Sequence, residues 1–198
     1  MDNPNFEIII GPMFSGKSTE LIRRVRIYKS INKKVLVIKP KIDNRYSVNK
    51  VSSHDKTEED CIVISDLKKI LENENNLLLF NDSDIVFIEE AQFFNNLKKF
   101  VLVCLEKFNK SVIVVGLDGD SNRNVFGEIL ELVPYCNKIV KLNSMCQVCK
   151  DGTLAPFTFK KTKSNEQIEV GGSELYFPLC RKHYLEYTNN VCEIINDA

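Results

Sequence analysis

Gly11-Pro-Met-Phe-Ser-Gly-Lys-Ser18 is the stretch of sequence that decides the fold of this chain. It matches G-x-x-x-x-G-K-[ST], the pattern of a phosphate-binding loop, or P-loop. Residues 6–10 before it are apolar and predict a buried strand, and residues 19–28 after it carry apolar side chains at helical spacing. A strand, a glycine loop and a helix in this order form the context in which the pattern binds phosphate. A glycine turn before an ordinary helix is the weaker interpretation, because sequence and context agree.

Each position of the loop suits a nucleoside triphosphate. Gly11 and Gly16 let the backbone turn its N–H groups toward a phosphate, and the following helix adds the positive end of its dipole. The ammonium group of Lys17 can reach the β- and γ-phosphates, and the Ser18 hydroxyl can bind Mg²⁺. We therefore expect the phosphates of ATP to contact this run of residues: Gly11, Pro12, Met13, Phe14, Ser15, Gly16, Lys17, Ser18 and Thr19.

The composition limits the class of protein. With 198 residues, 43% of them hydrophobic, the chain can form one good-sized domain, or such a domain with a small appendage. Its 27 basic and 27 acidic residues balance, so the net charge gives no sign of a nucleic-acid partner. The apolar runs are strand-sized and residues 1–5 lack the features of a signal peptide, so we expect no membrane span. Seven cysteines without an export signal favour reduced thiols or a metal site, and a cytoplasmic protein.

Short apolar runs alternate with helical patterns through the first part of the chain. Strands are predicted over residues 35–38, 61–64, 85–88, 111–116 and 138–142, and helices over residues 66–72, 97–108 and 129–133, the last ended by Pro134. Residues 41–60 are polar and predict loops, while the apolar residues 77–80 favour neither a strand nor a helix. This alternation predicts an α/β fold, an open parallel sheet with helices on both faces, as in P-loop NTPases.

Two adjacent carboxylates follow the predicted strand at residues 85–88. In P-loop proteins a strand beside the loop ends in a carboxylate that helps to hold Mg²⁺, a role that Glu89 would fill. The neighbouring Glu90 could accept a proton from the group that attacks the γ-phosphate. Acidic pairs are also common as solvated strand ends. Beside a P-loop of this quality, the catalytic interpretation is preferred.

Two metal-binding patterns lie in the last part of the chain. Cys146-Gln-Val-Cys149 and Cys180-Arg-Lys-His183 supply four ligands in two pairs, which is what a tetrahedral structural Zn²⁺ requires. Four protein ligands leave no position for water, so this metal would hold the fold and not catalyse. Residues 157–161 and 167–170 between the pairs alternate and predict strands. We expect residues 1–143 to form a P-loop ATP-binding domain. Residues 144–198 would form a zinc-tethered appendage, either a lid over a second substrate or a ribbon that touches another chain.

Together these motifs resemble those of the thymidine kinase family of the cytosolic, zinc-containing type. The resemblance runs nearly end to end, through residues 11–26, Asp43-x-Arg-Tyr-Ser47, Glu90-x-Gln-Phe-Phe94, Leu117-Asp-Gly119, both metal-binding pairs, and Gly171-Gly172 with Tyr176. It implies transfer of the γ-phosphate of ATP to the 5′-hydroxyl of thymidine, with Mg²⁺ and a structural Zn²⁺. It also implies a homotetramer, or a dimer, in the cytoplasm (of a host cell, for a virus), inhibited by the end product dTTP.

The resemblance also implies roles for single residues. Glu90 would be the general base for the 5′-hydroxyl, and Asp43 and Arg45 would lie near the phosphates and Mg²⁺. A lasso loop with Tyr176 would close over the base. The implied nucleoside contacts are Met13, Phe93, Leu117, Phe126, Thr158, Ile168, Val170, Gly171 and Tyr176. Backbone groups that read a pyrimidine edge suit a buried site, because the wrong base would leave them unpaired.

The sequence departs from the family pattern at several positions. Glu89 stands where the family usually has Asp, and Ser121 where many members have Phe. A member that has lost catalysis is therefore one alternative. Another is a P-loop ATPase whose zinc ribbon binds nucleic acid or a protein. The balanced charge and the lack of a basic, aromatic stripe count against that alternative.

Overall fold

A parallel sheet forms the centre of the larger part of the molecule. The computed structural model describes residues 3–42, 50–52, 58–162 and 166–196. The sheet has six strands in the order β5-β2-β6-β7-β1-β8, and every neighbouring pair is parallel. Its strands are β1 (Phe6–Ile10), β2 (Val35–Pro40), β5 (Ile62–Ile64), β6 (Ile85–Ile88), β7 (Ser111–Gly116) and β8 (Lys138–Lys141). The predicted open parallel α/β sheet is confirmed.

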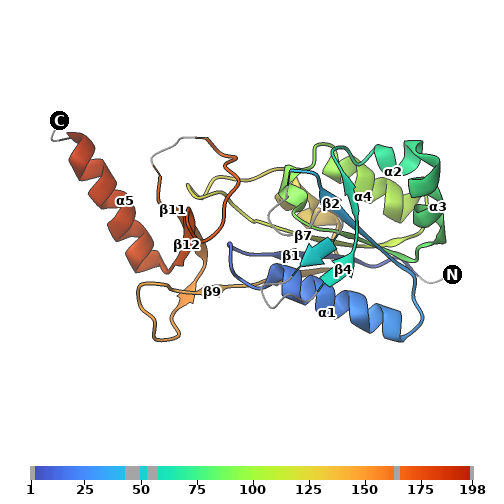
Figure 1. The fold of residues 1–198 in the computed structure, drawn as a ribbon, viewed down its shortest axis with the longest axis horizontal. Coiled ribbons are helices and arrows are strands. Elements are labelled where there is room, and N and C mark those ends of the chain that lie inside the picture. The colour runs from blue at the N-terminus through green and yellow to red at the C-terminus, as the bar shows by residue number, and fades with distance from the viewer. Residues whose placement is uncertain (1–2, 43–49, 53–57, 163–165, 197–198) are drawn as a thin grey trace.

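Helices cover both faces of this sheet (Figure 1). Because successive side chains of a strand point to opposite faces, Ile8 and Ile88 join one core cluster while Ile9 and Phe87 join another. The first cluster packs under α2 (Lys69–Glu72), α3 (Glu74–Asp82), α4 (Leu97–Glu106) and the 3₁₀ helix η2 (Ile129–Tyr135). The second packs under α1 (Lys17–Ser30) and a small hairpin, β3 (Lys50–Ser52) with β4 (Glu58–Asp60). Both faces are therefore buried, which explains the continuous apolar runs.

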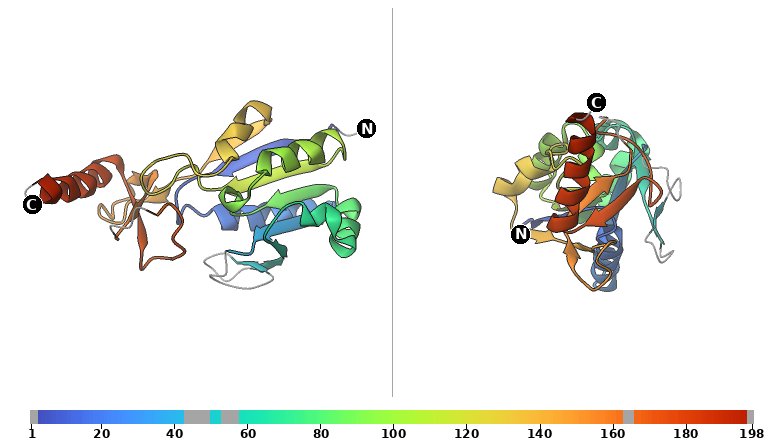
Figure 2. Two further views of the ribbon diagram at one scale, coloured as in Figure 1. Left: turned by 90° about the horizontal axis from the view of Figure 1, so that it is seen from above. Right: turned by 90° about the vertical axis from the view of Figure 1, so that its left-hand side faces the viewer.

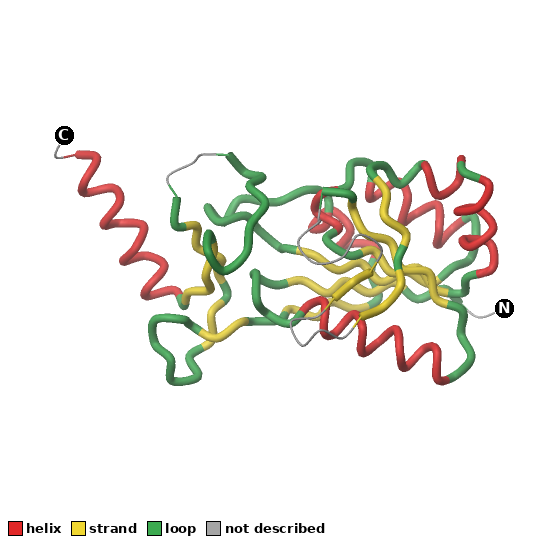
Figure 3. The backbone as a smooth tube through the Cα atoms, viewed as in Figure 1, coloured by secondary structure: helices red, strands yellow, loops and turns green. Residues whose placement is uncertain are grey.

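The zinc-ligand part of the chain forms a separate small core beside the sheet. Two antiparallel pairs build it, β9 (Ser144–Met145) with β10 (Leu154–Ala155) and β11 (Phe157–Lys160) with β12 (Tyr176–Leu179). Its aromatic rings stack edge to face, as Phe159 does on Tyr184 at 6.1 Å. The tube in Figure 3 shows this core joined to the sheet by loops. Helix α5 (Arg181–Asn196) then projects from the end of the molecule opposite the N-terminus (Figure 2).

Some local predictions were wrong, each for a physical reason. Residues 167–170 form no strand and run as an irregular loop, although they alternate. Pro134 does not end the helix before it, because η2 is a 3₁₀ helix and the Cys136 N–H still bonds the Val133 carbonyl across the proline. Residues 41–60 are not all loop, since β3 and β4 lie there. Residues 77–80, which had no assignment, belong to α3.

Parallel strands place their carboxyl ends, and so the turns that follow them, at one edge of the sheet. The turn after β1 is the P-loop, the turn after β6 begins with Glu89 and Glu90, and the turn after β7 begins with Leu117. In open α/β sheets ligands bind at this edge. The fold thus brings three separate stretches of sequence to one place.

Candidate active site

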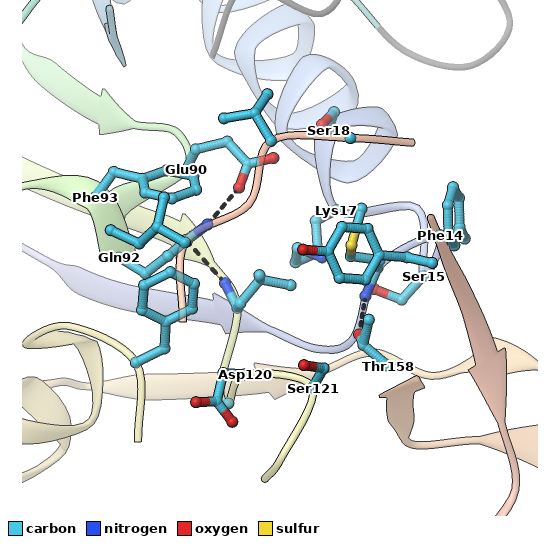
Figure 4. A pocket seen from close by; sticks show the side chains of 18 of the residues that line it. Phe14, Ser15, Lys17, Ser18, Glu90, Gln92, Phe93, Asp120, Ser121 and Thr158 are labelled. Carbon is cyan, nitrogen blue, oxygen red and sulfur yellow. Dashed lines mark hydrogen bonds between the residues drawn. The ribbon is translucent and has the colours of Figure 1, made fainter. Parts of the chain in front are cut away.

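A cavity of about 420 Å³ opens at this edge, between the sheet and the small core. The residues that line it come from the P-loop, the ends of β2, β6 and β7, and the loop before β12 (Figure 4). Every described residue for which a nucleoside contact was expected lines it: Met13, Phe93, Leu117, Phe126, Thr158, Ile168, Val170, Gly171 and Tyr176. So do Glu89, Glu90 and the loop residues 13–19, whereas Gly11 and Pro12 lie buried behind them. Asp43 and Arg45 lie outside the described residues.

The P-loop has a backbone that only glycine adopts easily at two points. Gly16 has a φ of 80°, in the left-handed region, just before the first turn of α1. A Cβ on Gly11 would lie 2.5 Å from the carbonyl oxygen of Leu142, so a side chain there would force the loop off the neighbouring strand end. The Lys17 ammonium donates to the Pro12 carbonyl at 2.7 Å and thus folds back over the loop. The loop is therefore wrapped around the N-terminus of a helix, as an anion site requires.

The acidic end of β6 is held in an uncommon conformation. Glu89 is buried, and Glu90 has a φ of 46° and a ψ of 42°, in the left-handed region. A left-handed residue other than glycine, Asn or Asp is rare, and such strain is concentrated at functional sites. The Glu90 carboxylate accepts a hydrogen bond of 2.6 Å from the side-chain amide of Gln92. Glu90 is thus fixed at the wall of the cavity.

Five polar residues of the cavity wall were not predicted from the sequence: Lys39, Gln92, Asp120, Gln167 and Glu169. Gln92 is 4% exposed and joins Glu90 to the Leu117 backbone, whose N–H donates to Gln92 Oε1 at 3.0 Å. Lys39, at the end of β2, is 1% exposed and lines the cavity beside the P-loop. A lysine that ends an otherwise apolar strand was the signal for Lys39. For Gln92 the signal was an amide placed two residues after a candidate base.

The loop before β12 closes one side of the cavity and is tied down at both ends. Gln167 donates to the Asp120 carboxylate at 2.9 Å and to the Val125 carbonyl at 3.2 Å. The Tyr176 hydroxyl donates to the Glu169 carbonyl at 2.7 Å, and the Glu169 carboxylate pairs with the buried Lys160 at 2.6 Å. These side-chain contacts hold the loop against the cavity, in place of the backbone hydrogen bonds of a strand.

The small core also contacts the P-loop directly. The Met13 N–H donates to the Thr158 hydroxyl at 2.9 Å, and Thr158 is 6% exposed (Figure 4). On the other side, the buried Tyr184 donates its hydroxyl to the Ser121 carbonyl at 2.6 Å, and the Arg123 guanidinium lies 4.7 Å from its ring centre. Two walls of the cavity are therefore anchored on the small core, one of them through Tyr184, which packs with Cys146 and Cys180.

The four predicted zinc ligands converge. The ligand atoms of Cys146, Cys149, Cys180 and His183 all lie within 4.8 Å of one another. His183 Nδ1 lies 3.3 to 3.5 Å from the three sulfurs, and the Cys149 and Cys180 sulfurs are 3.9 Å apart. A tetrahedral Zn²⁺ with bonds of about 2.0–2.3 Å needs edges of about 3.5–3.8 Å. The donor set and its spacing both fit zinc.

Local electrostatics favour a thiolate at Cys146, whereas burial and the neighbouring sulfurs raise the pKa of Cys149 to about 11. Burial alone would raise the pKa of Cys146, but hydrogen bonds from the backbone at Cys149, Cys180 and Val148, with His183, outweigh it and lower that pKa to about 6. Backbone N–H groups directed at a sulfur stabilise its negative charge. His183 Nε2 lies 3.9 Å from the Glu186 carboxylate, which suits an imidazole that binds metal through Nδ1.

Comparison with known proteins identifies the family. The family model for thymidine kinase matches residues 5–184. The chain belongs to the thymidine kinase family. It is 43% identical over 189 residues to the thymidine kinase of Amsacta moorei entomopoxvirus, covering 91% of this chain and 97% of that one. It is also 37% identical over 190 residues to that of Vaccinia virus (strain Western Reserve), covering 94% and 99% of the two chains. Against the thymidine kinase of Oryza sativa subsp. japonica it is 37% identical over 180 residues, 90% of this chain and 65% of that one.

Membership of the thymidine kinase family agrees with the arrangement of the cavity. The match covers the P-loop, the acidic end of β6 and all four Cys and His residues of the metal cluster. No helix in the described part of the chain is long and apolar enough to span a membrane.

Proposed function

We propose that this protein is an active thymidine kinase, which transfers the γ-phosphate of ATP to the 5′-hydroxyl of thymidine. One observation carries the proposal: a carboxylate fixed at the wall of the cavity shares that cavity with a P-loop and with the loop before β12. A base, a phosphate site and a cover are what phosphoryl transfer to an alcohol needs. The domain division proposed for this chemistry is an ATP-binding part over residues 1–143 and a zinc-binding lasso part over residues 144–198.

The P-loop fits the phosphates of ATP. In the described part of the chain, the Ser15 hydroxyl is the one buried side-chain oxygen or nitrogen without a hydrogen-bond partner, and it lies inside the loop. An orphaned donor there supports a ligand with acceptor oxygens. In this proposal the loop amides and Lys17 hold the phosphates, with Asp43 and Arg45 nearby. Lys17 exchanges the Pro12 carbonyl for a phosphate oxygen when ATP binds.

Glu90 is the proposed general base. As the 5′-oxygen of thymidine forms its bond to the γ-phosphorus, the bond from that phosphorus to the β,γ-bridging oxygen breaks and ADP leaves. The 5′-hydroxyl proton passes to the Glu90 carboxylate. Positioned acid–base groups of this kind contribute about 10²- to 10⁴-fold in rate. The covering loop keeps water from taking the place of thymidine.

The wall opposite the P-loop is the proposed thymine site. Phe93 and Phe126 meet edge to face, with ring centres 5.4 Å apart, and form an apolar surface beside Leu117. Tyr176 and the backbone at Ile168, Val170 and Gly171 face it from the covering loop. Met13 and Thr158, which are hydrogen-bonded to each other, complete the proposed site between the thymine ring and the phosphates.

Two metals belong to the proposal. Ser18 and Glu89 both line the cavity, and their oxygens are ligands that Mg²⁺ prefers. Mg²⁺ would neutralise charge on the β- and γ-phosphates. Zinc on Cys146, Cys149, Cys180 and His183 would hold the small core, and with it the covering loop.

The testing experiment is ADP release from ATP and Mg²⁺ in the presence of thymidine, deoxycytidine, single-stranded DNA or no acceptor. We expect release that depends on thymidine and is lost in Glu90→Gln, while ATP binding remains. Release without an acceptor, or stimulated by DNA alone, would refute kinase activity in favour of an ATPase with a nucleic-acid-binding ribbon. Transfer that survives Glu90→Gln would refute the base assignment.

Three further features remain predictions of the resemblance. They are a homotetramer or dimer, inhibition by dTTP, and a cytoplasmic location. Light scattering at working concentrations tests the first. Inhibition that thymidine competes away tests the second, because dTTP would occupy the thymidine site. Fractionation of cells that express the protein tests the third.

A further inference from the structure

One buried amide touches both halves of the proposed reaction site. We propose that Gln92 is a positioning residue, which holds the Glu90 carboxylate and the Leu117 backbone in one fixed arrangement. This inference rests on the proposed function, in which Glu90 accepts the proton and Leu117 lines the nucleoside site. Gln92 acts through these two groups and need not touch the reacting atoms.

The hydrogen bonds fix which way the amide points. Gln92 Nε2 donates to Glu90 Oε2 at 2.6 Å, and Gln92 Oε1 accepts from the Leu117 N–H at 3.0 Å (Figure 4). In the opposite orientation the amide oxygen would face a carboxylate and the amide NH₂ would face an N–H donor. Both contacts would then be repulsive, so a single orientation is stable.

The packing around Gln92 leaves it no room to move. It is 4% exposed, and a Cβ on Gly116 would lie 2.4 Å from Gln92 Oε1. A Cβ on Gly127, whose φ is 63°, would lie 2.4 Å from the Gln92 carbonyl oxygen. The glycine at the end of β7 thus lets the backbone approach the Gln92 side chain, and Gly127 lets a loop approach the Gln92 backbone. Such close approach is a reason for glycine at both positions.

Glu90 needs such support because its own backbone is strained. The left-handed conformation of Glu90 disfavours a residue with a β-carbon and persists only where neighbours hold it. The short 3₁₀ helix η1 (Ala91–Phe93) turns the chain so that the side chain of Gln92 returns to that of Glu90. Gln92 therefore gives the carboxylate a fixed direction at the cavity wall.

Leu117 is the second half of the arrangement. It is the first residue after β7, and the same turn carries Gly119, Asp120 and Ser121 into the cavity wall. A shift of the Leu117 backbone would move the nucleoside site relative to Glu90. Because general base catalysis depends on the distance between the base and the hydroxyl, Gln92 sets the register between substrate and base.

A double-mutant cycle tests the inference. Gln92→Met, Glu90→Gln and the double variant are compared with wild type by single-turnover transfer from γ-labelled ATP to thymidine. We expect Gln92→Met to slow transfer roughly 10- to 100-fold, with the affinity for ATP unchanged. In the Glu90→Gln background, the same substitution should slow the small residual rate of single-turnover transfer no further, because residues that act as a unit are not additive. Asn75→Leu, an exposed amide on α3 outside the cavity, is the matched control.

A second variant guards against a fold defect. Gln92→Glu has the same size and keeps an acceptor for the Leu117 N–H, but it replaces the donor to Glu90 with a second carboxylate that repels it. It should lower the transfer rate while raising the KM for thymidine less than Gln92→Met does. Equal effects of the two variants on both constants would overturn the positioning role.

The outcomes separate the two proposals. If wild type transfers phosphate to thymidine and the effects in the cycle multiply, Gln92 is merely structural and the inference is overturned while the function stands. If wild type transfers no phosphate to thymidine, the proposed function is wrong, and the positioning role with it.

Discussion

Arg24 links the strand and the helix on either side of the P-loop, and its replacement by Met should destabilise the protein. The Arg24 guanidinium donates to Glu7 on β1 and, at 2.8 Å, to Glu20 on α1. The side chains of Arg24 and Glu7 are each 11% exposed. Arg24→Met would leave the Glu7 carboxylate buried without its main partner, and breaking a buried pair in this way costs about 3–5 kcal/mol.

Two remaining contacts reduce that figure here. The Asn5 amide donates to Glu7 at 2.9 Å, and the Lys138 ammonium lies 3.9 Å from it. We therefore expect a loss of about 2–3 kcal/mol, which for a chain of this size lowers Tm by about 4–12 °C.

Thermal unfolding followed by circular dichroism checks this, and Arg23→Met is the matched control. Arg23 also donates to Glu20, at 2.7 Å, but is 59% exposed, so its removal should lower Tm much less than the removal of Arg24 does. Adding Glu7→Met to Arg24→Met should recover part of the loss, because no buried charge is then stranded. Equal Tm values for the Arg23 and Arg24 variants would refute the argument that burial makes the difference.

Three further predictions concern the metal, a glycine and a thiol. Cys149→Ser should lower the zinc content and abolish transfer to thymidine while the sheet persists, whereas Cys136→Ser, outside the cluster, should keep its zinc. Metal analysis and circular dichroism measure the two effects. A full zinc content in Cys149→Ser would contradict the assignment of Cys149 as a ligand. Gly127→Ala should lower kcat at least about tenfold, because the new Cβ would meet the Gln92 carbonyl oxygen. Gly152 also has a positive φ, of 91°, but no atom lies within 4 Å of a Cβ there, so Gly152→Ala should cost only about 1 kcal/mol of stability. Steady-state kinetics measures the first effect and urea unfolding the second. Burial raises the pKa of the Cys104 thiol from 9.0 to about 12, so the unfolded chain ionises first and stability falls as the pH rises from about 9 toward 12. At about pH 10 the free energy of unfolding is lower by about 1.4 kcal/mol for this reason. Urea titrations at several pH values should show a smaller decrease for Cys104→Ala than for wild type.

Much of the fold and the metal cluster could be predicted from sequence because their signals are local. The P-loop is one unbroken pattern between a strand and a helix, and each metal-binding pair has its two ligands three residues apart. The five further strands predicted for the parallel sheet were found near their predicted places because a buried parallel strand is a short continuous apolar run.

What could not be predicted depends on contacts between distant segments. The role inferred for Gln92 requires Leu117, 25 residues away, and the glycines that let the loops close. Residues 167–170 alternate like a strand, but the Gln167 side chain donates to Asp120 and the Glu169 carbonyl accepts from the Tyr176 hydroxyl, so no ladder forms. Lys39 has no periodic signal, because its burial follows from the cavity at the end of β2.

The hydrogen bond between Met13 and Thr158 has a consequence for the order in which the parts of the chain fold. It joins residues 145 positions apart, so closing it restricts a very long stretch of chain. Contacts this distant in sequence form slowly, because the entropy of loop closure must be overcome first. On a ribosome the P-loop strand and helix emerge long before Thr158 is made. Phosphate transfer to thymidine should therefore begin later than native secondary structure forms. A nascent chain that already binds nucleotide would still lack this activity.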